Sequence, residues 1–262
     1  MTLTTAILSV LSGSLVGLSL GLIGGGGSIL AVPLMAYVVG LPPHAAIGTS
    51  AVAVAASALV NLGGHARAGT VRWSCAIVFA MSGVAGAAIG AQIGKRVDGQ
   101  ALLGAFGVLM IVVAGLMLRP RRGGHDPRVR LTRASARRLL PPLAATGLAV
   151  GALSGFFGIG GGFLIVPGLI SATAMPLLNA IGSSLVSVAA FGATTAVSYA
   201  ASGLIAWRIA GLFILGGLAG GYAGIEAAKT LAGRKRMLAV VFSAVVALVG
   251  LYVTFRGLVR FY

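Results

Sequence analysis

Two clusters of glycines are the parts of this sequence best suited to bind a small solute. Both lie in apolar sequence, and each is followed by a short apolar stretch that ends at a proline, Pro42 or Pro176. Consecutive glycines let neighbouring N–H groups converge, and the N-terminus of a following helix adds donors and a positive dipole end. We therefore expect an anion site whose backbone donors come from Gly24, Gly25, Gly26, Gly27, Ser28, Gly158, Gly160, Gly161 and Gly162.

A second pair of motifs offers hydroxyl groups to the same site. The segment AIGTS ends in Thr49 and Ser50, and AIGSS ends in Ser183 and Ser184. A hydroxyl donates a hydrogen bond to an anion without placing a charge inside a membrane, where charges are costly. We expect these four hydroxyls to line the site together with the glycine backbones.

Three basic or titratable residues and one acid are candidates for a vestibule or for coupling. His65 and Arg67 stand at the end of an apolar segment, either as an interfacial cluster that sets orientation or as a vestibule that attracts anions. His44 follows the prolines, where it could approach the site or cap a helix. Glu226 lies three residues before Lys229, so an interfacial pair is favoured over proton coupling.

Other chemistries find little support in the sequence. It has only three acidic residues, Asp98, Asp126 and Glu226, which excludes paired catalytic carboxylates and an acidic cation site. One cysteine, Cys75, allows no internal disulfide and fits no metal cluster. Neither glycine cluster carries the Lys-Ser/Thr of a phosphate-binding loop. We expect no enzyme activity, no metal and no cofactor.

The composition predicts a polytopic membrane protein. Of 262 residues, 58% are hydrophobic and 8% are charged, whereas soluble domains contain about 25% charged residues. The net charge of +16 is concentrated in one stretch and at the ends of apolar runs, which is typical of membrane orientation rather than of a nucleic-acid surface. The expected partners are a lipid bilayer and a small anionic substrate, not nucleic acid.

An internal duplication organises the chain. At a constant offset of 134, GLIGGGGSILAVP overlies GFFGIGGGFLIVP and AIGTSAVAVAA overlies AIGSSLVSVAA, and Trp73 meets Trp207. The predicted architecture is therefore all-α, with two homologous repeats of four to five transmembrane segments each and glycine-broken helices at the centre. The first repeat covers 1–118 and the second covers 141–262, with a basic linker at 119–140.

The basic residues suggest how the repeats sit in the membrane. Eight of the nineteen lie between Arg119 and Arg138, which places the linker in the cytoplasm. The basic cluster between Lys229 and Arg236 falls on the same side only if the two halves are inverted. We therefore favour inverted repeats over parallel ones, in a multi-pass protein of a bacterial-type inner membrane.

The paired motifs resemble those of the sulfite exporter TauE/SafE family. The resemblance rests on the two glycine motifs ending in Val-Pro, on AIGTS and AIGSS, and on the series His65, Arg67, Gly69, Val71 and Trp73. It covers nearly the whole chain and implies a permease for sulfite, organosulfonates or related anions. The second half lacks the His-x-Arg pair and has Tyr199 and Ala201 instead. A channel-like pore for a small anionic or neutral solute is the alternative.

Overall fold

A computed structural model describes residues 2–23, 25–118, 133–230 and 235–259. Within these ranges the chain forms helices and no strand. In chain order the helices are α1 (Leu3–Ile23), the 3₁₀ helix η1 (Gly25–Leu30), α2 (Ala31–Pro33), the π-helix η2 (Leu34–Val38), α3 (Pro43–Arg67), α4 (Trp73–Gly94), α5 (Gly99–Leu118), α6 (Arg133–Phe157), α7 (Gly162–Thr173), α8 (Leu177–Ala200), α9 (Trp207–Thr230) and α10 (Lys235–Val259).

The lengths and composition of these helices are those of a membrane protein. Seven helices in the described ranges are long and apolar enough to cross a bilayer. Two shorter apolar segments, Gly27–Val38 and Gly162–Thr173, follow the two glycine clusters. A helix of 12 residues such as α7 rises about 18 Å, which is less than the roughly 30 Å hydrocarbon core. The prediction of an all-α membrane protein is confirmed, and a short helical segment follows each glycine cluster.

The helices of the two halves correspond at the offset of 134. Adding 134 to the bounds of α4 (73–94) gives 207–228, and α9 spans 207–230. The backbone agrees at the turns as well, because φ is positive at Gly40 (83°) and at Ala174 (56°). Gly69 (66°) and Gly203 (69°) form a second such pair.

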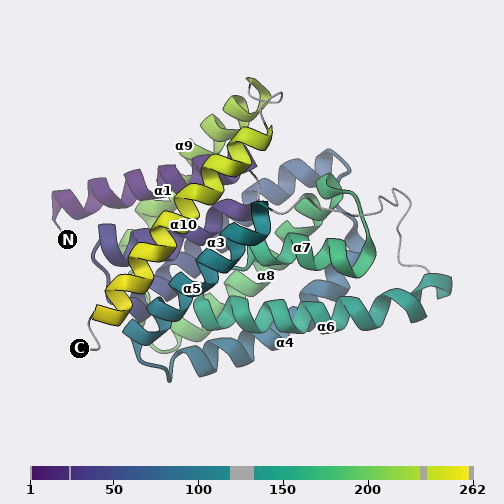
Figure 1. The fold of residues 1–262 in the computed structure, drawn as a ribbon, viewed down its shortest axis with the longest axis horizontal. Coiled ribbons are helices and arrows are strands. Elements are labelled where there is room, and N and C mark those ends of the chain that lie inside the picture. The colour runs from purple at the N-terminus through teal and green to yellow at the C-terminus, as the bar shows by residue number, and fades with distance from the viewer. Residues whose placement is uncertain (1, 24, 119–132, 231–234, 260–262) are drawn as a thin grey trace.

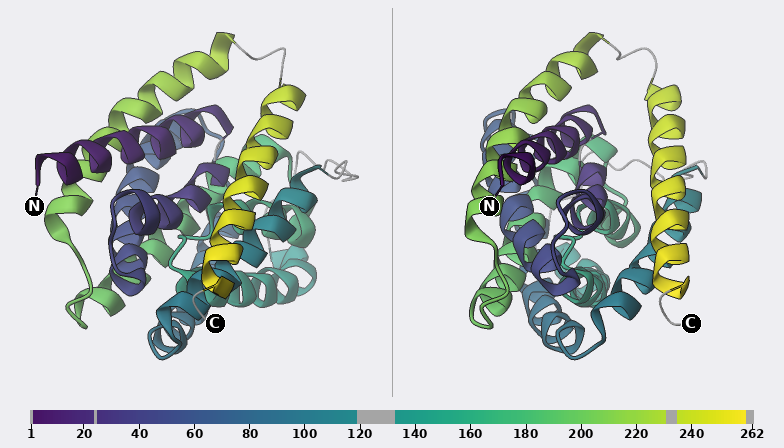
Figure 2. Two further views of the ribbon diagram at one scale, coloured as in Figure 1. Left: turned by 60° about the vertical axis from the view of Figure 1, so that its left-hand side comes forward. Right: turned by 90° about the vertical axis from the view of Figure 1, so that its left-hand side faces the viewer.

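The corresponding helices also make corresponding contacts. Figure 1 shows α4 beside α6 along one edge of the bundle and α1 beside α9 along the other, and both pairs are in close contact. Since α1 corresponds to α6 and α9 to α4, one helix pair occurs twice. A third pair, α5 and α10, lies against the side of the bundle (Figure 2). The central pair is α3 and α8, with 56% and 61% of their spans buried, against 28% in α1 and α6.

The central pair runs antiparallel. Gly48, near the start of α3, lies against Tyr199 at the end of α8, while Gly182, near the start of α8, lies against His65 at the end of α3. Two corresponding helices that cross in opposite directions are related by a twofold axis perpendicular to their length.

Glycines allow the outer pairs to approach at backbone distance. A Cβ on Gly17 would lie 2.0 Å from the Gly217 carbonyl oxygen in α9, and a Cβ on Gly151 would lie 2.1 Å from that of Gly83 in α4. Gly86 likewise abuts the backbone of α6. The isolated glycines of α1, α4, α6 and α9 therefore serve helix packing, as small residues commonly do in membranes.

The two short segments differ in regularity. In the second half, α7 is a continuous α-helix, whereas the first half divides the equivalent stretch into 3₁₀, α and π pieces.

The helix α6 begins earlier than the predicted second repeat. It starts at Arg133, before Pro141 and Pro142, and not at residue 141 where the apolar segment starts. Residues 119–132 of the basic linker lie outside the described residues, as does Gly24.

Candidate functional site

The second glycine cluster forms a left-handed turn between α6 and α7. The φ angles of Gly158, Gly160 and Gly161 are 67°, 65° and 69°, which glycine adopts without the penalty that a Cβ would bring. The turn is packed against α3, because a Cβ on Gly158 would lie 2.1 Å from Ile47 Cγ2 and one on Gly160 would lie 2.6 Å from Val54 Cγ1. These positions therefore require glycine for both conformation and space.

Unpartnered donors gather at this turn. The backbone N–H groups of Gly160 and Gly161 are buried and take part in none of the loop hydrogen bonds of the described chain, in which Ile159 N donates to Ser154 O and Leu164 N donates to Gly161 O. The Ser154 hydroxyl is fully buried and has no hydrogen-bond partner among the described residues. A Cβ on Gly161 would lie 3.0 Å from Ser154 Oγ, so this hydroxyl adjoins the turn.

The first glycine cluster lies next to the second half's short helix. Its residues Gly25 to Leu30 form η1, which contacts α1 and α7. Gly27 is closely packed, since a Cβ there would lie 2.5 Å from Leu20 N in α1. Ser28 is fully buried. The contact between η1 and α7 brings the two glycine regions together at the middle of the bundle.

Two of the four predicted site hydroxyls bond within their own helix turns. Ser50 donates to Ile47 O at 2.9 Å, and its Oγ lies 3.4 Å from Gly158 O, so it adjoins the second glycine turn. Ser184 donates to Ile181 O at 2.8 Å. The structure thus brings Ser50 next to Gly158.

The other two predicted site hydroxyls hold loops of the opposite half. Thr49 Oγ1 accepts a hydrogen bond from Ala206 N at 3.1 Å, and Ser183 Oγ accepts one from Arg72 N at 2.8 Å. These two bonds correspond at the offset of 134. Each loop leads into a helix, α9 or α4, so each hydroxyl joins the start of a central helix to the other half.

The predicted vestibule residues occupy separate places. His44 Nε2 lies 3.3 Å from Gly94 O, and His65 Nδ1 lies 2.9 Å from Thr70 Oγ1. Arg67 is exposed at the end of α3, and Glu226 is exposed near the end of α9. The side chain of Lys229, its predicted partner, lies outside the described residues. His65 is the member of this set closest to the second hydroxyl motif, because its ring adjoins Gly182.

Acidic and metal-binding chemistry is absent from the described interior. Asp98 accepts hydrogen bonds from Gln100 N (2.9 Å) and Ala101 N (3.0 Å), so it caps the start of α5. The described residues contain no group of three or more His, Cys, Asp or Glu side chains that could hold a metal ion.

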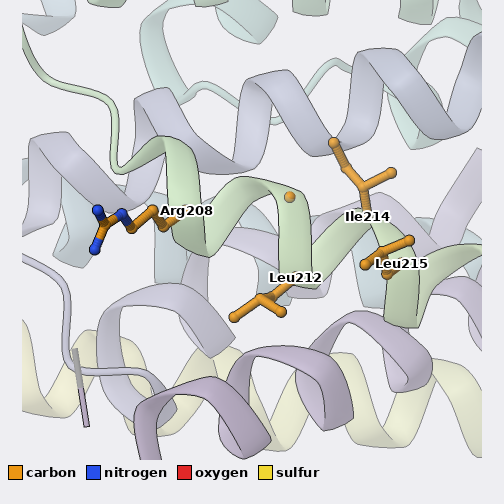
Figure 3. A pocket seen from close by; sticks show the side chains of 5 residues that line it. Arg208, Leu212, Ile214 and Leu215 are labelled. Carbon is orange, nitrogen blue, oxygen red and sulfur yellow. The ribbon is translucent and has the colours of Figure 1, made fainter.

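Among the grooves on the outer surface of the described residues, two concern the candidate site. Figure 3 shows the first, of about 540 Å³, whose lining side chains Arg208, Leu212, Ile214 and Leu215 all belong to α9. Because a single apolar helix lines it, this groove suits contact with lipid. The second, of about 480 Å³, lies between α4 and α8 and contains Gln92, Lys95, Thr194 and Ser198.

Sequence reasoning missed Ser154 and Lys95. Ser154 stands in an ordinary-looking ALSGF segment, and its position opposite Leu20 in the other repeat was the only signal available. Lys95 belongs to the basic residues at the ends of apolar runs, and the structure adds that its Nζ donates to Ser198 O and Ser202 Oγ, both at 3.1 Å, across the bundle. The Lys95 bonds join residues about a hundred positions apart. Ser154 meets Gly161 because the left-handed glycine turn folds back against the end of α6.

Comparisons with known proteins agree with this architecture. The family model described as sulfite exporter TauE/SafE matches residues 9–253. A probable membrane transporter protein of Xylella fastidiosa strain 9a5c is 50% identical over 258 residues, which cover 98% of each chain. The probable membrane transporter protein YunE of Bacillus subtilis strain 168 is 27% identical over 270 residues, covering 96% of this chain and 98% of its own. No solved structure matches this chain significantly.

Proposed function

This chain is a membrane transporter of the sulfite exporter TauE/SafE family, and we propose that it carries a small oxyanion such as sulfite or an organosulfonate across the inner membrane. The name of the family, which refers to sulfite export, suggests the substrate class. The site we assign lies where the second glycine turn meets the end of α6 and the start of α7. We also place the basic linker on the cytoplasmic side, because positively charged segments are retained there.

One observation carries this assignment: a buried hydroxyl without a partner among the described residues meets two buried backbone N–H groups that make no loop hydrogen bond within the described part of the chain. They are the N–H groups of Gly160 and Gly161 and the hydroxyl of Ser154. Buried N–H groups are almost always paired in native proteins, because leaving one unpaired is destabilising. An oxyanion offers several acceptor oxygens to such a cluster, and α7 adds its positive dipole end.

The neutrality of these donors suits transport. A fixed cation would hold the anion strongly in a medium of low dielectric, whereas dipoles and hydroxyls bind it and still release it. A permease for cations would need carboxylates near the centre. Of the three acids in the sequence, Asp98 caps α5, Glu226 is exposed, and Asp126 lies outside the described residues.

The antiparallel central pair supports inverted repeats. If α3 and α8 cross the membrane, the twofold axis that relates them lies in the membrane plane, which is the arrangement of many secondary transporters. Access to the site could then alternate as the two halves rock. A channel would share the glycine turn but would need no alternation, so saturation and counterflow distinguish the two.

The test is uptake into proteoliposomes with labelled sulfite, a small sulfonate and a small carboxylate. Gly161→Ala places a Cβ at positive φ beside Ser154, and Ser154→Ala removes one donor. We expect Gly161→Ala to abolish uptake and Ser154→Ala to raise KM about tenfold, since a hydrogen bond to a charged group contributes about 1.5–3 kcal/mol. Counterflow of one anion against another identifies a carrier.

The matched control is Gly63→Ala in α3, where an added Cβ meets nothing within 4 Å. It should leave uptake and folded yield at the wild-type level. The proposal is wrong if none of the three anions enters vesicles that contain correctly folded wild-type protein. The site assignment alone is wrong if folded Gly161→Ala and Ser154→Ala both transport normally.

A further inference from the structure

A row of buried hydroxyls on α8 lacks partners. Ser187, Thr195 and Tyr199 are fully buried, and their hydroxyls, like the buried Oγ of Ser198, find no hydrogen-bond partner among the described residues. At 100° per residue the four lie within about 120° of the helix circumference, so they share one broad face. Unpaired buried hydroxyls are destabilising and rare in native proteins. Four on one helix call for an explanation other than packing.

The row connects two places already described. At its inner end, Val188 follows Ser187 and has Cγ1 3.4 Å from the position of a Cβ on Gly160, beside the central turn. At its outer end, Lys95 Nζ lies 5.9 Å from the centre of the Tyr199 ring. The twelve steps along the helix from Ser187 to Tyr199 rise about 18 Å, which is roughly the distance from the middle of a bilayer to its surface.

The groove between α4 and α8 lies at the outer end of the row. Its volume is about 480 Å³, and Lys95 and Ser198 both line it. Lys95 is half-buried and donates to Ser198 O and Ser202 Oγ, so its ammonium group is held at this end of α8. A fixed cation at the mouth of a neutral route raises the local concentration of anions.

We propose that the hydroxyl row of α8 (Ser187, Thr195, Ser198 and Tyr199) is the route by which a small oxyanion moves between the central site and a mouth at Lys95. This inference rests on the proposed function. Each hydroxyl replaces part of the anion's hydration shell while carrying no charge of its own, so the anion is solvated but not trapped.

An aromatic residue interrupts the row. Phe191 lies between Ser187 and Thr195 on the same face, and its ring stacks on Phe79 with centroids 6.3 Å apart. The ring is confined by α4, since a Cβ on Gly83 would lie 2.0 Å from Phe191 Cζ. The route is therefore closed by Phe191 in this conformation and opens only when that ring moves, as expected of a carrier.

The test measures anion uptake and thermal stability for the same variants, in liposomes of phosphatidylcholine alone. Thr195→Val and Tyr199→Phe each remove a hydroxyl at nearly constant shape. We expect each to raise KM about tenfold while the unfolding midpoint stays equal to or above that of the wild type. A purely structural hydroxyl without a partner would show the same midpoint and an unchanged KM. Thr254→Val, whose hydroxyl donates to Gly250 O, is the control for loss of a partnered hydroxyl.

Lys95→Gln tests the mouth, with Arg96→Gln as the control of equal charge on the exposed neighbouring residue. We expect Lys95→Gln to raise KM at least fivefold and to weaken its dependence on ionic strength, and Arg96→Gln to leave both nearly unchanged. Phosphatidylcholine carries no net charge, so its use removes net anionic lipids as the source of any Lys95 effect.

The route is wrong if Thr195→Val, Tyr199→Phe and Lys95→Gln all keep wild-type KM while Gly161→Ala abolishes uptake. That pattern leaves the central site and the transported anion in place. If folded wild-type protein carries none of the anions tested, the proposed function fails first and the route fails with it.

Discussion

The two central helices, α3 and α8, correspond in sequence but differ in how their polar groups are satisfied. In α3, Ser50 donates to Ile47 O and Asn61 donates to Ser57 O, while His65 bonds to Thr70. The equivalent face of α8 carries four buried hydroxyls without partners among the described residues: Ser187, Thr195, Ser198 and Tyr199.

This difference distinguishes the hydrogen bonds that join the two repeats from the unpaired hydroxyls that we assign to anion transport. The bonds from Ala206 N to Thr49 and from Arg72 N to Ser183 are equivalent in the two halves and join each central helix to the other repeat. Beyond this shared framework, four of the buried hydroxyls without partners among the described residues lie on α8 and one, Ser154, adjoins the turn before α7, while Ser243 lies apart from them on α10. Under the proposed function, the anion site therefore lies on one side of two corresponding helices, because substitutions that leave helix packing unchanged alter only which polar groups remain unpaired.

The largest expected effect concerns the contact of α3 with the second glycine turn. Gly158→Ala combines positive φ with a Cβ that would lie 2.1 Å from Ile47 Cγ2, so it should destabilise the protein by about 3 kcal/mol or more. Gly203→Ala has a similar φ in open space and should cost only about 1 kcal/mol. Unfolding can be followed with a thiol-reactive dye, because the buried Cys75 becomes accessible on unfolding. Equal loss in both variants would show that packing against α3 contributes nothing.

The shared framework predicts equal effects in the two halves. Thr49→Val leaves Ala206 N without its acceptor, and Ser183→Ala leaves Arg72 N without its own, so each should cost about 1–3 kcal/mol. Unfolding of both variants can be followed with the same thiol-reactive dye. A large difference between the two losses of stability would show that the equivalent bonds do not stabilise the two halves equally.

The contrast between α3 and α8 predicts changes in stability of opposite sign at the corresponding positions 53 and 187. Ser187→Ala removes an unpaired hydroxyl and should stabilise the protein by about 1 kcal/mol, whereas Ala53→Ser adds one to the buried face of α3 and should destabilise it by about as much. Both variants are compared by thermal midpoint in one detergent. Stabilisation by Ala53→Ser would show that α3 has a partner to offer and that the contrast is not intrinsic to these faces.

The smallest expected effect concerns the ends of the two short segments. Ala174 has φ of 56° where the first half has Gly40, and it is exposed. Ala174→Gly should relieve the strain of a left-handed alanine and stabilise the protein by about 0.5 kcal/mol after the entropy lost by glycine. Gly40→Ala should instead destabilise the protein. A lower midpoint for Ala174→Gly would mean that the Cβ of Ala174 contributes packing that outweighs its strain.

The sequence by itself determined the membrane class, the positions of most helices and the two glycine regions. These features are local: the length of an apolar run is set by bilayer thickness, and a glycine cluster interrupts a helix whatever surrounds it. The helices α4 and α9 accordingly begin at Trp73 and Trp207, which the sequence pairs at the offset of 134. The offset of 134 was also readable, because equivalent residues repeat in the same order.

Only the tertiary structure decided which polar groups are satisfied. Thr49 and Ser183 look like free donors in the sequence, yet each accepts a bond from a loop of the other half. Ser154 looks like a packing residue, yet it adjoins Gly161 and has no partner among the described residues. Hydrogen bonding depends on helix crossings between residues more than a hundred positions apart, and no local pattern encodes those crossings.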